Sequence, residues 1–530
     1  MNWQRWVLIA LMLTGFILSW LLLKPEILGF IYDDAVYLLA AKSLAYGQGY
    51  FLHSTSPAIP IVKYPPLFPL LLAPLWWFFP HFPENIIAFK LVPVICLLGV
   101  LYILYREGVR QNPNKTWFAL IPVGLLALDS SVSFVSSSLL SETFFMMLSL
   151  GVLFWLGRQD PLNPKQFPSH FKIAVFSVLP YYTRSIGITL ILAIFIWLWQ
   201  QRSFKYALQY LTWSALLLSP WLAWSILQAP PVLHWENTFL VDYNHSYMLD
   251  LGINYQRLGG FWPWLWDGLQ ALSLVTVNRL FRLLPHLPLN DGVSSILQNI
   301  LAGGLCIGFT SWALKSRTNK WSLSSLYFIF YLIALLLWST DKLQYWRLLI
   351  PVFPLFWLAL LQGFKPAKKV QNVFIILFLL QFMTGSLLYA INLINNRFSN
   401  QMALNTPHLW QEYQNTFKFM SSLPKDAKLL TPYNHAYFLY THRPTWCLNA
   451  YSFNQSQTGS YRQHFQKVYS HLMHLNHVNY VIVEPAIGYS TIVSTTAMPL
   501  VNELITNQPE KFSLIYQSRS KSIKIYHFNG

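Results

Sequence analysis

The chain has 530 residues, of which 54% are hydrophobic and only 10% are charged, and its mean hydropathy is +0.38. Soluble domains carry about 25% charged residues, so this composition excludes a wholly soluble protein. The formal charge of +17 comes from small basic clusters between apolar runs, which is typical of membrane proteins and argues against a nucleic-acid-binding protein.

Apolar runs long enough to cross a bilayer recur over the first three quarters of the sequence. Residues 171–200 are too short for two full spans and too long for one, so they predict two short helices that meet at Arg184. The proline-broken residues 65–80 predict an interfacial or re-entrant helix. The other predicted spans are 6–23, 86–105, 116–136, 138–157, 206–228, 294–314, 321–339, 347–363 and 370–390. We therefore predict a polytopic α-helical membrane protein with about 11 transmembrane helices.

The distribution of charge predicts the orientation of these spans. With a cytoplasmic N-terminus, nearly every basic cluster falls on the inner side, as the positive-inside rule requires. No small-residue cleavage site follows the first run, so we expect a signal anchor in a multi-pass protein of the plasma (inner) membrane. The outer side then receives residues 24–85, 229–292 and 339–347, the tail, and most acids of the membrane domain.

The tail differs in composition from the rest of the chain, because it has no long apolar run and holds most of the histidines. The segments AKLLTP, YVIVEP, FSLIYQ and SIKIYHF predict strands, with helices between them. We therefore expect a multi-pass membrane domain over residues 1–392 and a small soluble extracytoplasmic α/β domain over residues 393–530.

Two adjacent acids, Asp33 and Asp34, follow the first apolar run, at the predicted edge of the membrane. One interpretation is structural: a helix N-cap and a first-turn acid before an Ala- and Leu-rich helix. The other is functional, because acids near a bilayer are candidates for a site. The cap explains one acid better than two, and it leaves the other outer charges unexplained.

Five segments, in this order, resemble the GT-C superfamily of membrane glycosyltransferases. They are YDDAVYLLAAKSLAYGQGY, YPPLFPLLLAPLWWFF, SSLLSETFFMMLSL, TRSIGITL and YWRLLIPVFPLFWL. The resemblance covers the membrane domain and is greatest to the branch of the protein O-mannosyltransferases and the lipid A aminoarabinose transferase. It implies a hexosyl- or pentosyltransferase that moves a sugar from a polyprenyl-phosphate carrier to a lipid, glycan or protein acceptor on the outer face of the membrane.

The resemblance also implies roles for residues of the first outer loop. The essential acid of the family corresponds to Asp33, with Asp34 beside it, and a family tyrosine corresponds to Tyr37. Many relatives have a lysine that is proposed to meet the phosphate, at the position held here by Tyr64. Lys63 lies one residue earlier, so this chain departs from the pattern there.

The chemistry of such a transfer fits these residue types. A carboxylate can take the proton of the attacking hydroxyl, and we expect Asp33 to be that base. The leaving lipid phosphate needs a cation, for which Arg347 is the first candidate and Arg184 the second. Arg184 also fits a snorkelling residue at a helix turn. Glu142 can orient Asp33 or an arginine, or form a simple buried ion pair.

Other interpretations stay open at this point. Asp33 and Asp34 offer hard oxygen ligands that suit Mg²⁺ or Mn²⁺, and the family contains both metal-dependent and metal-independent enzymes. The main rival function is a polytopic transporter or lipid-linked glycan flippase, although the sequence shows no internal repeat of the kind that transporters often have. A non-catalytic anchor for the tail is the other rival, but it would not need charges on several outer loops.

The predicted topology can be tested by cysteine labelling. A cysteine introduced between residues 400 and 530 should react with a membrane-impermeant reagent on intact cells, because charge asymmetry places the tail outside. A cysteine introduced into the basic cluster at 106–115 should react only after permeabilisation. A tail that stays protected until the cells are permeabilised would contradict the orientation.

Overall fold

The computed structural model describes residues 2–160, 167–228, 260–280, 322–338, 345–363, 369–398, 409–447, 473, 477–484 and 491–529. The chain forms two compact units. Unit 1 comprises Met1–Leu23, Lys90–Ala223 and Leu251–Ile394, and unit 2 comprises Lys24–Phe89, Trp224–Asp250 and Asn395–Gly530. The loop predicted over residues 24–85 thus lies in the same unit as the tail, and the domain division at residues 392–393 stays a prediction.

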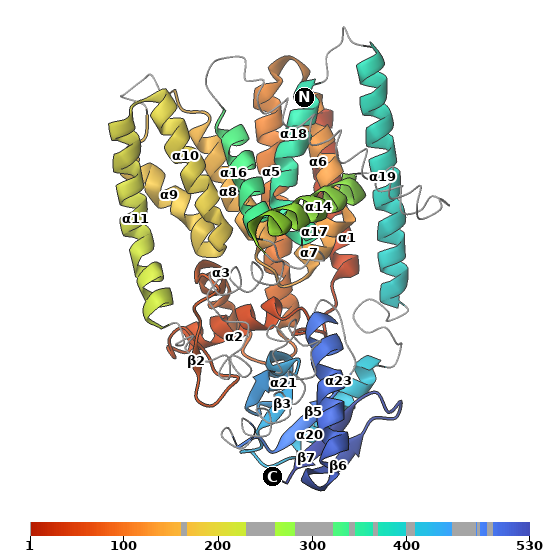
Figure 1. Cartoon of the computed structure of the whole chain (residues 1–530). Helices are drawn as coiled ribbons and strands as arrows, with labels where there is room; N and C mark the ends of the chain where they lie inside the picture. Colours follow the sequence, from red (N-terminus) through yellow and green to blue (C-terminus); the bar gives the residue numbers. More distant parts are fainter. Residues whose placement is uncertain are drawn as a thin grey trace. The chain divides into compact units, whose positions relative to one another are not determined.

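Unit 1 is helical in every part that the structure describes, and most of its helices run side by side (Figure 1). Its α-helices are α1 (Asn2–Leu22), α5 (Ile86–Gln111), α6 (Leu120–Ala127), α7 (Ser130–Ser137), α8 (Glu142–Leu156), α9 (His170–Thr183), α10 (Ile188–Gln201), α11 (Phe204–Leu227), α14 (Phe261–Leu280), α16 (Leu323–Trp338), α17 (Tyr345–Leu348), α18 (Phe353–Gly363) and α19 (Lys369–Phe398). Short 3₁₀ turns lie at η1 (Pro113–Ala119), η2 (Ser185–Gly187) and η5 (Ile350–Val352).

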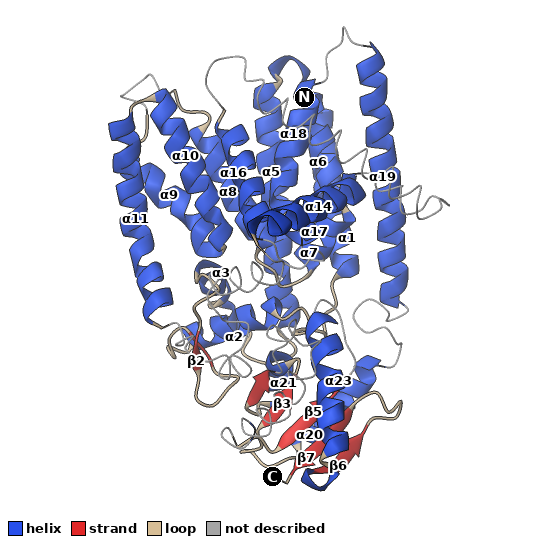
Figure 2. Ribbon diagram, viewed as in Figure 1, coloured by secondary structure: helices blue, strands red, loops and turns tan. Residues whose placement is uncertain are grey.

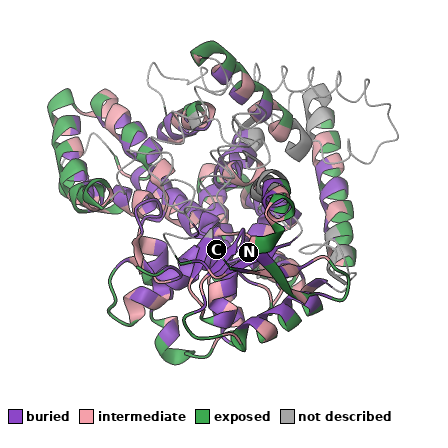
Figure 3. Ribbon diagram, turned by 60° about the horizontal axis from the view of Figure 1, so that its bottom comes forward, coloured by how far each residue is buried: buried purple, intermediate pink, exposed green. Residues whose placement is uncertain are grey.

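Several of these helices suit a membrane. Among the described residues, three helices are each long and apolar enough to cross a bilayer, and a fourth crossing results if one bent pair is a single span. Shorter apolar helices cover most of the other predicted spans, while residues 294–314 lie outside the described part. Much of α11 is exposed (Figure 3), as expected of a helix whose apolar side chains face lipid. The protein is a polytopic membrane protein, and the count of 11 stays a prediction.

The predicted span over residues 116–136 is broken. Residues Pro113–Ala127 and Ser130–Ser137 are bent by 61° relative to each other. Asp129 lies at the bend, and its Oδ1 accepts hydrogen bonds from the amides of Ser131 and Val132, at 3.0 and 3.4 Å. The carboxylate thus satisfies the first free amides of α7 and starts a new helix there.

The predicted turn at Arg184 is confirmed. Helix α9 ends at Thr183, Arg184 has extended backbone angles, and η2 leads into α10. Gly187 makes this tight return possible, because a Cβ there would lie only 2.4 Å from the amide nitrogen of Tyr181. Two short helices therefore replace one long span.

The outer loop predicted over residues 229–292 contains the helix α14, which the sequence analysis missed. It lies crosswise to the bundle of unit 1 in Figure 1 and packs against α16 and α17. Its WPWLW segment exposes Trp262 and Trp266 and buries Trp264. Exposed tryptophans on such a helix suit the headgroup region of a bilayer, which agrees with a role as an interfacial anchor.

All the strands of the described structure belong to unit 2 (Figure 2). A small antiparallel pair joins β1 (Phe51–Leu52) to β2 (Ile59–Pro60). The main sheet has the order β4-β3-β5-β7-β6, in which β3 pairs parallel with β4 and β5, and β7 pairs antiparallel with β5 and β6. Its strands are β3 (Leu429–Thr431), β4 (Thr445–Cys447), β5 (Tyr480–Val483), β6 (Phe512–Gln517) and β7 (Lys524–Phe528).

The four strands predicted in the tail are confirmed, and the sequence analysis missed β4. The helices of unit 2 are α2 (Asp33–Ala45), α3 (Leu67–Leu72), α4 (Leu75–Phe78), α20 (Leu409–Ser421), α21 (Asn434–Thr441) and α23 (Thr491–Asn507). Together α3 and α4 cover Leu67–Phe78, which at 1.5 Å per residue is about 18 Å and too short to cross a bilayer. The interpretation of residues 65–80 as less than a full span agrees with this length.

The central strand of the main sheet, β5, is buried on both faces. Alternate residues of β5 serve different clusters: Val481 and Val483 pack with Leu504 of α23, whereas Tyr480 and Ile482 pack in the cluster that holds α20 and α21. Phe30, from the first outer loop, belongs to this second cluster. That aromatic anchor explains why the loop and the tail form one compact unit.

A buried carboxyl lies where β5 ends. Glu484 accepts hydrogen bonds from the hydroxyl of Thr431 at 2.6 Å and from that of Tyr437 at 2.8 Å. Burial raises the pKa of Glu484 to about 7, despite the opposing effect of these hydroxyls and that of Tyr413. Near neutral pH the folded protein therefore holds a proton that the unfolded chain releases.

We predict that this carboxyl makes unit 2 less stable as the pH rises from about 5 to about 8. The native state binds more protons than the unfolded state in this window, so the free energy of unfolding falls with rising pH, by up to about 3 kcal/mol. The stabilisation is complete below the unfolded pKa near 4.5 and is lost as the pH passes about 7. Thermal unfolding of the full chain at several pH values should show this loss, and Glu484→Gln should reduce it.

Glu412 provides the matched control. Burial raises the pKa of Glu412, but hydrogen bonds from Ser520, Ser518 and Ser522 outweigh it and hold the pKa below its usual value. The contribution of Glu412 to stability is present above the unfolded pKa and is lost as the pH falls. Glu412→Gln should therefore leave unchanged the fall in stability that occurs above pH 5. A Glu484→Gln variant with the same pH dependence as the natural protein would contradict the assignment.

Candidate functional site

The two acids of the first outer loop open α2. The helix begins at Asp33, and the N-cap position is held by Tyr32, which makes no side-chain capping bond. Asp33 and Asp34 are both buried, with 8% and 2% of their surface exposed. Both acids thus lie in the first turn, where the helix dipole favours negative charge. Neither acid takes the N-cap position, which the interpretation of the pair as a helix cap assigned to one of them.

Asp33 is held by an aromatic cluster. The hydroxyl of Tyr64 donates a hydrogen bond to Asp33 Oδ1 at 2.8 Å. Tyr37 packs edge-on against the Tyr64 ring, with 5.4 Å between the ring centres, and the hydroxyl of Tyr50 donates to the carbonyl oxygen of Tyr64 at 2.7 Å. The structure therefore brings together three residues predicted from the sequence. Tyr64 contacts the acid directly.

Asp34 has a different environment from its neighbour. Its Oδ2 accepts a hydrogen bond from the amide of Gly29, and its Oδ1 accepts one from the amide of Ala35, each at 2.9 Å. An acid next to Asp33 can hold a metal, an arginine or the loop itself. The hydrogen bonds from two backbone amides support the last of these roles for Asp34. Lys63 is also buried, with 3% of its surface exposed.

In unit 1 three charged candidates meet in one cluster. Glu142 Oε1 lies 2.9 Å from Nη1 of Arg184 and 3.0 Å from Nε of Arg347. The Glu142 side chain is completely buried, and the two arginine side chains are only 14% and 13% exposed. Glu142 thus pairs with two guanidinium groups, an arrangement that fits both a positioning role and a simple buried ion pair.

Local breaks in the helices place these three side chains. Glu142 is the first residue of α8, Arg184 lies between α9 and η2, and Arg347 lies on the short α17. Ser141 adds a further contact, because its Oγ accepts a hydrogen bond from Arg184 Nη1 at 3.1 Å. The sequence analysis quoted this serine within a motif but gave it no role, since a lone serine carries no signal of a long-range contact.

The cluster carries one negative and two positive formal charges. Arginine side chains with little exposure interact strongly with anions, because few water molecules screen their charge. Two guanidinium groups provide planar arrays of donors that match a phosphate. The arrangement can therefore bind a phosphate and stabilise charge that develops on it.

A divalent metal has less support from the residues. Among the described residues, no group of three or more His, Cys, Asp and Glu side chains could hold a metal ion. Both oxygens of Asp34 already accept hydrogen bonds from backbone amides, and Asp33 accepts a hydrogen bond from the hydroxyl of Tyr64. We therefore assign no step of the chemistry to a metal, and Mg²⁺ or Mn²⁺ at Asp33 and Asp34 stays an untested prediction.

Comparison with known proteins gives a likeness of fold. No protein-family model matches the chain, and no curated protein matches it. The crystal structure of the Archaeoglobus fulgidus oligosaccharyltransferase, tethered to an acceptor peptide with the NVT sequon, aligns over 100% of this chain and 74% of its own. The TM-score is 0.53 at 12% sequence identity. The chain therefore shares the fold of this oligosaccharyltransferase.

Two structures of ArnT from Cupriavidus metallidurans also align with the chain. One is bound to undecaprenyl phosphate and the other is in the apo state, and each alignment covers 99% of this chain and 98% of the ArnT chain. The TM-scores are 0.45 and 0.47, at 11% and 12% identity. The resemblance predicted from the five sequence segments is thus confirmed for the fold, while the activity rests on the residues themselves.

We predict that Arg347→Ala lowers binding of a polyprenyl phosphate, or turnover with its sugar-linked form, by on the order of tenfold or more, since a desolvated cation is lost. Arg347→Lys should restore only part of this, because an ammonium lacks the planar fork. Binding is measured with purified protein in lipid nanodiscs, and turnover with a polyprenyl-phosphate sugar.

Arg110 offers a matched control for this experiment. It pairs with another buried carboxylate, Glu107, but its side chain is 46% exposed. Arg110→Ala should therefore leave carrier binding unchanged. Full transfer by a normally expressed Arg347→Ala protein would remove Arg347 from the site.

Proposed function

We propose that the protein is a glycosyltransferase that moves a hexosyl or pentosyl group from a polyprenyl-phosphate carrier to an acceptor on the outer face of the membrane. The observation that carries this proposal is the burial of Asp33 at the start of α2, where its carboxylate accepts a hydrogen bond from the hydroxyl of Tyr64. The fold shared with an oligosaccharyltransferase supports it, as does the doubly basic cluster around Glu142.

Asp33 is the general base in this proposal. The hydroxyl of the acceptor attacks the anomeric carbon of the sugar and loses its proton to the carboxylate. The bond between that carbon and the phosphate oxygen breaks, and the electron pair leaves on the lipid phosphate. Tyr64 and Tyr37 fix the orientation of Asp33, so that the carboxylate needs little rearrangement during the step.

Arg347 and Arg184 stabilise the leaving phosphate. The negative charge on this group grows as the bond breaks, and preorganised cations in a dry site are most effective against such charge. Glu142 is a positioning residue, because its carboxylate holds both guanidinium groups. The proposal assigns a third cation to the substrate, Lys63, which lies in the predicted first outer loop.

A transporter or flippase for lipid-linked glycans is the second candidate. The buried pairing of Arg184 and Arg347 with Glu142 would also suit the passage of a lipid phosphate, since it needs only binding. The tyrosine-held Asp33 favours the transferase, because transport requires no proton acceptor for a hydroxyl. The two functions differ in whether a new glycosidic bond is formed.

We predict that Asp33→Asn abolishes transfer while expression and fold remain intact. Asparagine keeps the size of the side chain and removes the charge that accepts the proton. The assay uses a polyprenyl-phosphate sugar, purified protein and membrane extract as the source of acceptor, and it measures transferred label. Asp34→Asn should cost less, because Asp34 holds the loop.

Asp129→Asn is the matched control. Asp129 is another buried acid, but it caps α7, and asparagine caps helices about as well as aspartate. This variant should therefore transfer at nearly the natural rate. Robust transfer by Asp33→Asn would show that the acid pair only starts a helix. Movement of the lipid carrier across the membrane without formation of a new glycosidic bond would favour the flippase.

A further inference from the structure

The segment that leads into Asp33 is held by one short helix of the tail. This segment, Glu26–Tyr32, and the helix α21 both belong to unit 2. Three side chains of α21 contact it at successive points: His435, Ala436 and Tyr440. The proposed chemistry assigns no task to these residues, which are separated from Asp33 by about four hundred positions in the sequence.

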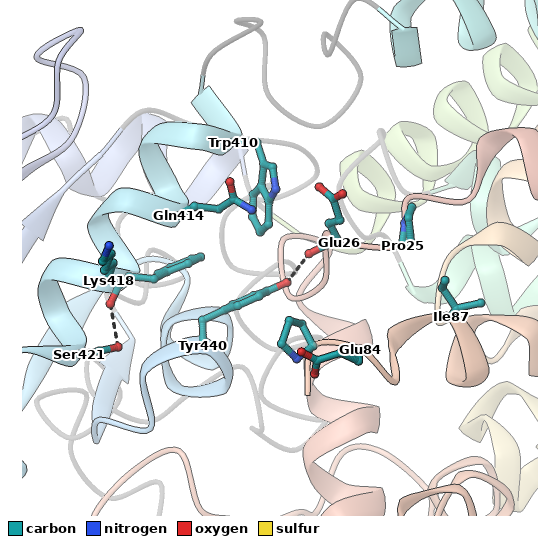
Figure 4. A pocket seen from close by; sticks show the side chains of 11 residues that line it. Pro25, Glu26, Glu84, Ile87, Trp410, Gln414, Lys418, Ser421 and Tyr440 are labelled. Atoms are coloured by element: carbon teal, nitrogen blue, oxygen red, sulfur yellow. Dashed lines mark hydrogen bonds between the residues drawn. The ribbon is translucent and has the colours of Figure 1, made fainter. Parts of the chain in front are cut away.

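Tyr440 binds the backbone of the segment twice. Its hydroxyl donates a hydrogen bond to the carbonyl oxygen of Glu26 at 2.7 Å (Figure 4). The same hydroxyl accepts a hydrogen bond from the amide of Leu28 at 3.2 Å. Burial raises the pKa of Tyr440 far above its usual value, so the hydroxyl stays protonated and keeps donating. The ring is fixed in turn by a parallel stack on Phe417, with 4.6 Å between the ring centres.

Gly29 lies directly against α21. Its φ is +99°, a value that side chains rarely adopt, and a Cβ at this position would lie 2.6 Å from Cβ of Ala436. The amide of Gly29 also donates to Oδ2 of Asp34. This glycine therefore joins the surface of α21 to the acid next to Asp33.

Tyr32 forms the last contact before the helix. Its φ is +74°, and its ring lies 4.9 Å from the ring of His435. Nδ1 of His435 is in turn 3.0 Å from the hydroxyl oxygen of Ser54, which lies further along the first outer loop. A strained residue persists only where its surroundings fix it, and here α21 provides that support.

We propose that α21 is a positioning element for catalysis, which sets the place of Asp33 through Tyr440, Ala436 and His435. This inference rests on the proposed function of Asp33 as the base. The tail then acts on the transfer step itself, and His435, Ala436 and Tyr440 are positioning residues that touch no substrate. Because a displacement of about 1 Å at a catalytic group can cost a hundredfold in rate, small losses of support are measurable.

The first test removes one hydroxyl. Tyr440→Phe keeps the stack on Phe417 but loses both bonds to the segment. We expect kcat for sugar transfer to fall about tenfold, with an unchanged KM for the donor and little change in the unfolding temperature. Tyr516→Phe is the matched control, because its hydroxyl lies in the same tail at 3.5 Å from that of Thr416. It should leave kcat unchanged.

The second test adds one methyl group. Gly29→Ala places a Cβ against Ala436, whereas Gly47→Ala has a similar positive φ of +68° and nothing within 4 Å of the new Cβ. Both variants carry the backbone strain, but only Gly29→Ala should lower kcat, by tenfold or more. Equal losses in the two glycine variants, or an unchanged kcat in both Tyr440→Phe and Gly29→Ala, would overturn the inference.

Hydrogen exchange separates this inference from the proposed function. In the full chain, Tyr440→Phe should speed amide exchange over residues 26–35 and leave β5 unaffected, whether or not the protein transfers sugar. Natural protein that forms no product with any polyprenyl-phosphate sugar would contradict the proposed function alone. Unchanged exchange over residues 26–35 in Tyr440→Phe would contradict the positioning role alone.

Discussion

A charge that leaves water must find a partner, and this constraint accounts for most of the polar structure of the protein. Each of several buried acids has its own solution in the described residues. Asp33 accepts a hydrogen bond from a tyrosine hydroxyl, and Glu142 pairs with two arginines. Glu484 lies among hydroxyl groups, and its pKa is raised to about 7 by burial. In an apolar chain with few acids, each of these solutions fixes the position of a carboxyl and of the elements around it.

Interruptions of regular helix place the charged groups that the proposed function needs. Asp33 follows a residue with positive φ, and Glu142 begins a helix after a short turn. Arg184 lies where Gly187 allows two helices to meet at close range. Continuous spans would bury such side chains among apolar neighbours, whereas a helix end leaves room for a polar cluster. The breaks in the bundle therefore contribute to function as well as to fold.

Much of the fold could be predicted because it depends on local patterns. Apolar runs, alternating strands in the tail and the turn at Arg184 all leave a signal within a few residues. The helix α14 was missed because its aromatic start was interpreted as part of a loop. The strand β4 was missed because its sequence, TWC, has no run of aliphatic residues, whereas the equally short β3 contains two leucines. The compact units also join the first outer loop to the tail, since Phe30 packs into the core beside the sheet.

The sequence by itself determined the membrane class, four of the five strands of the main sheet and the short list of charged candidates, because composition and periodicity are local properties. Only the tertiary structure decided which candidates meet: Glu142 with Arg184 and Arg347, and Asp33 with Tyr64. It also decided that α21 supports the segment before Asp33. Such contacts join positions far apart in the chain, and they are set by the packing of whole elements, which no short stretch of sequence records.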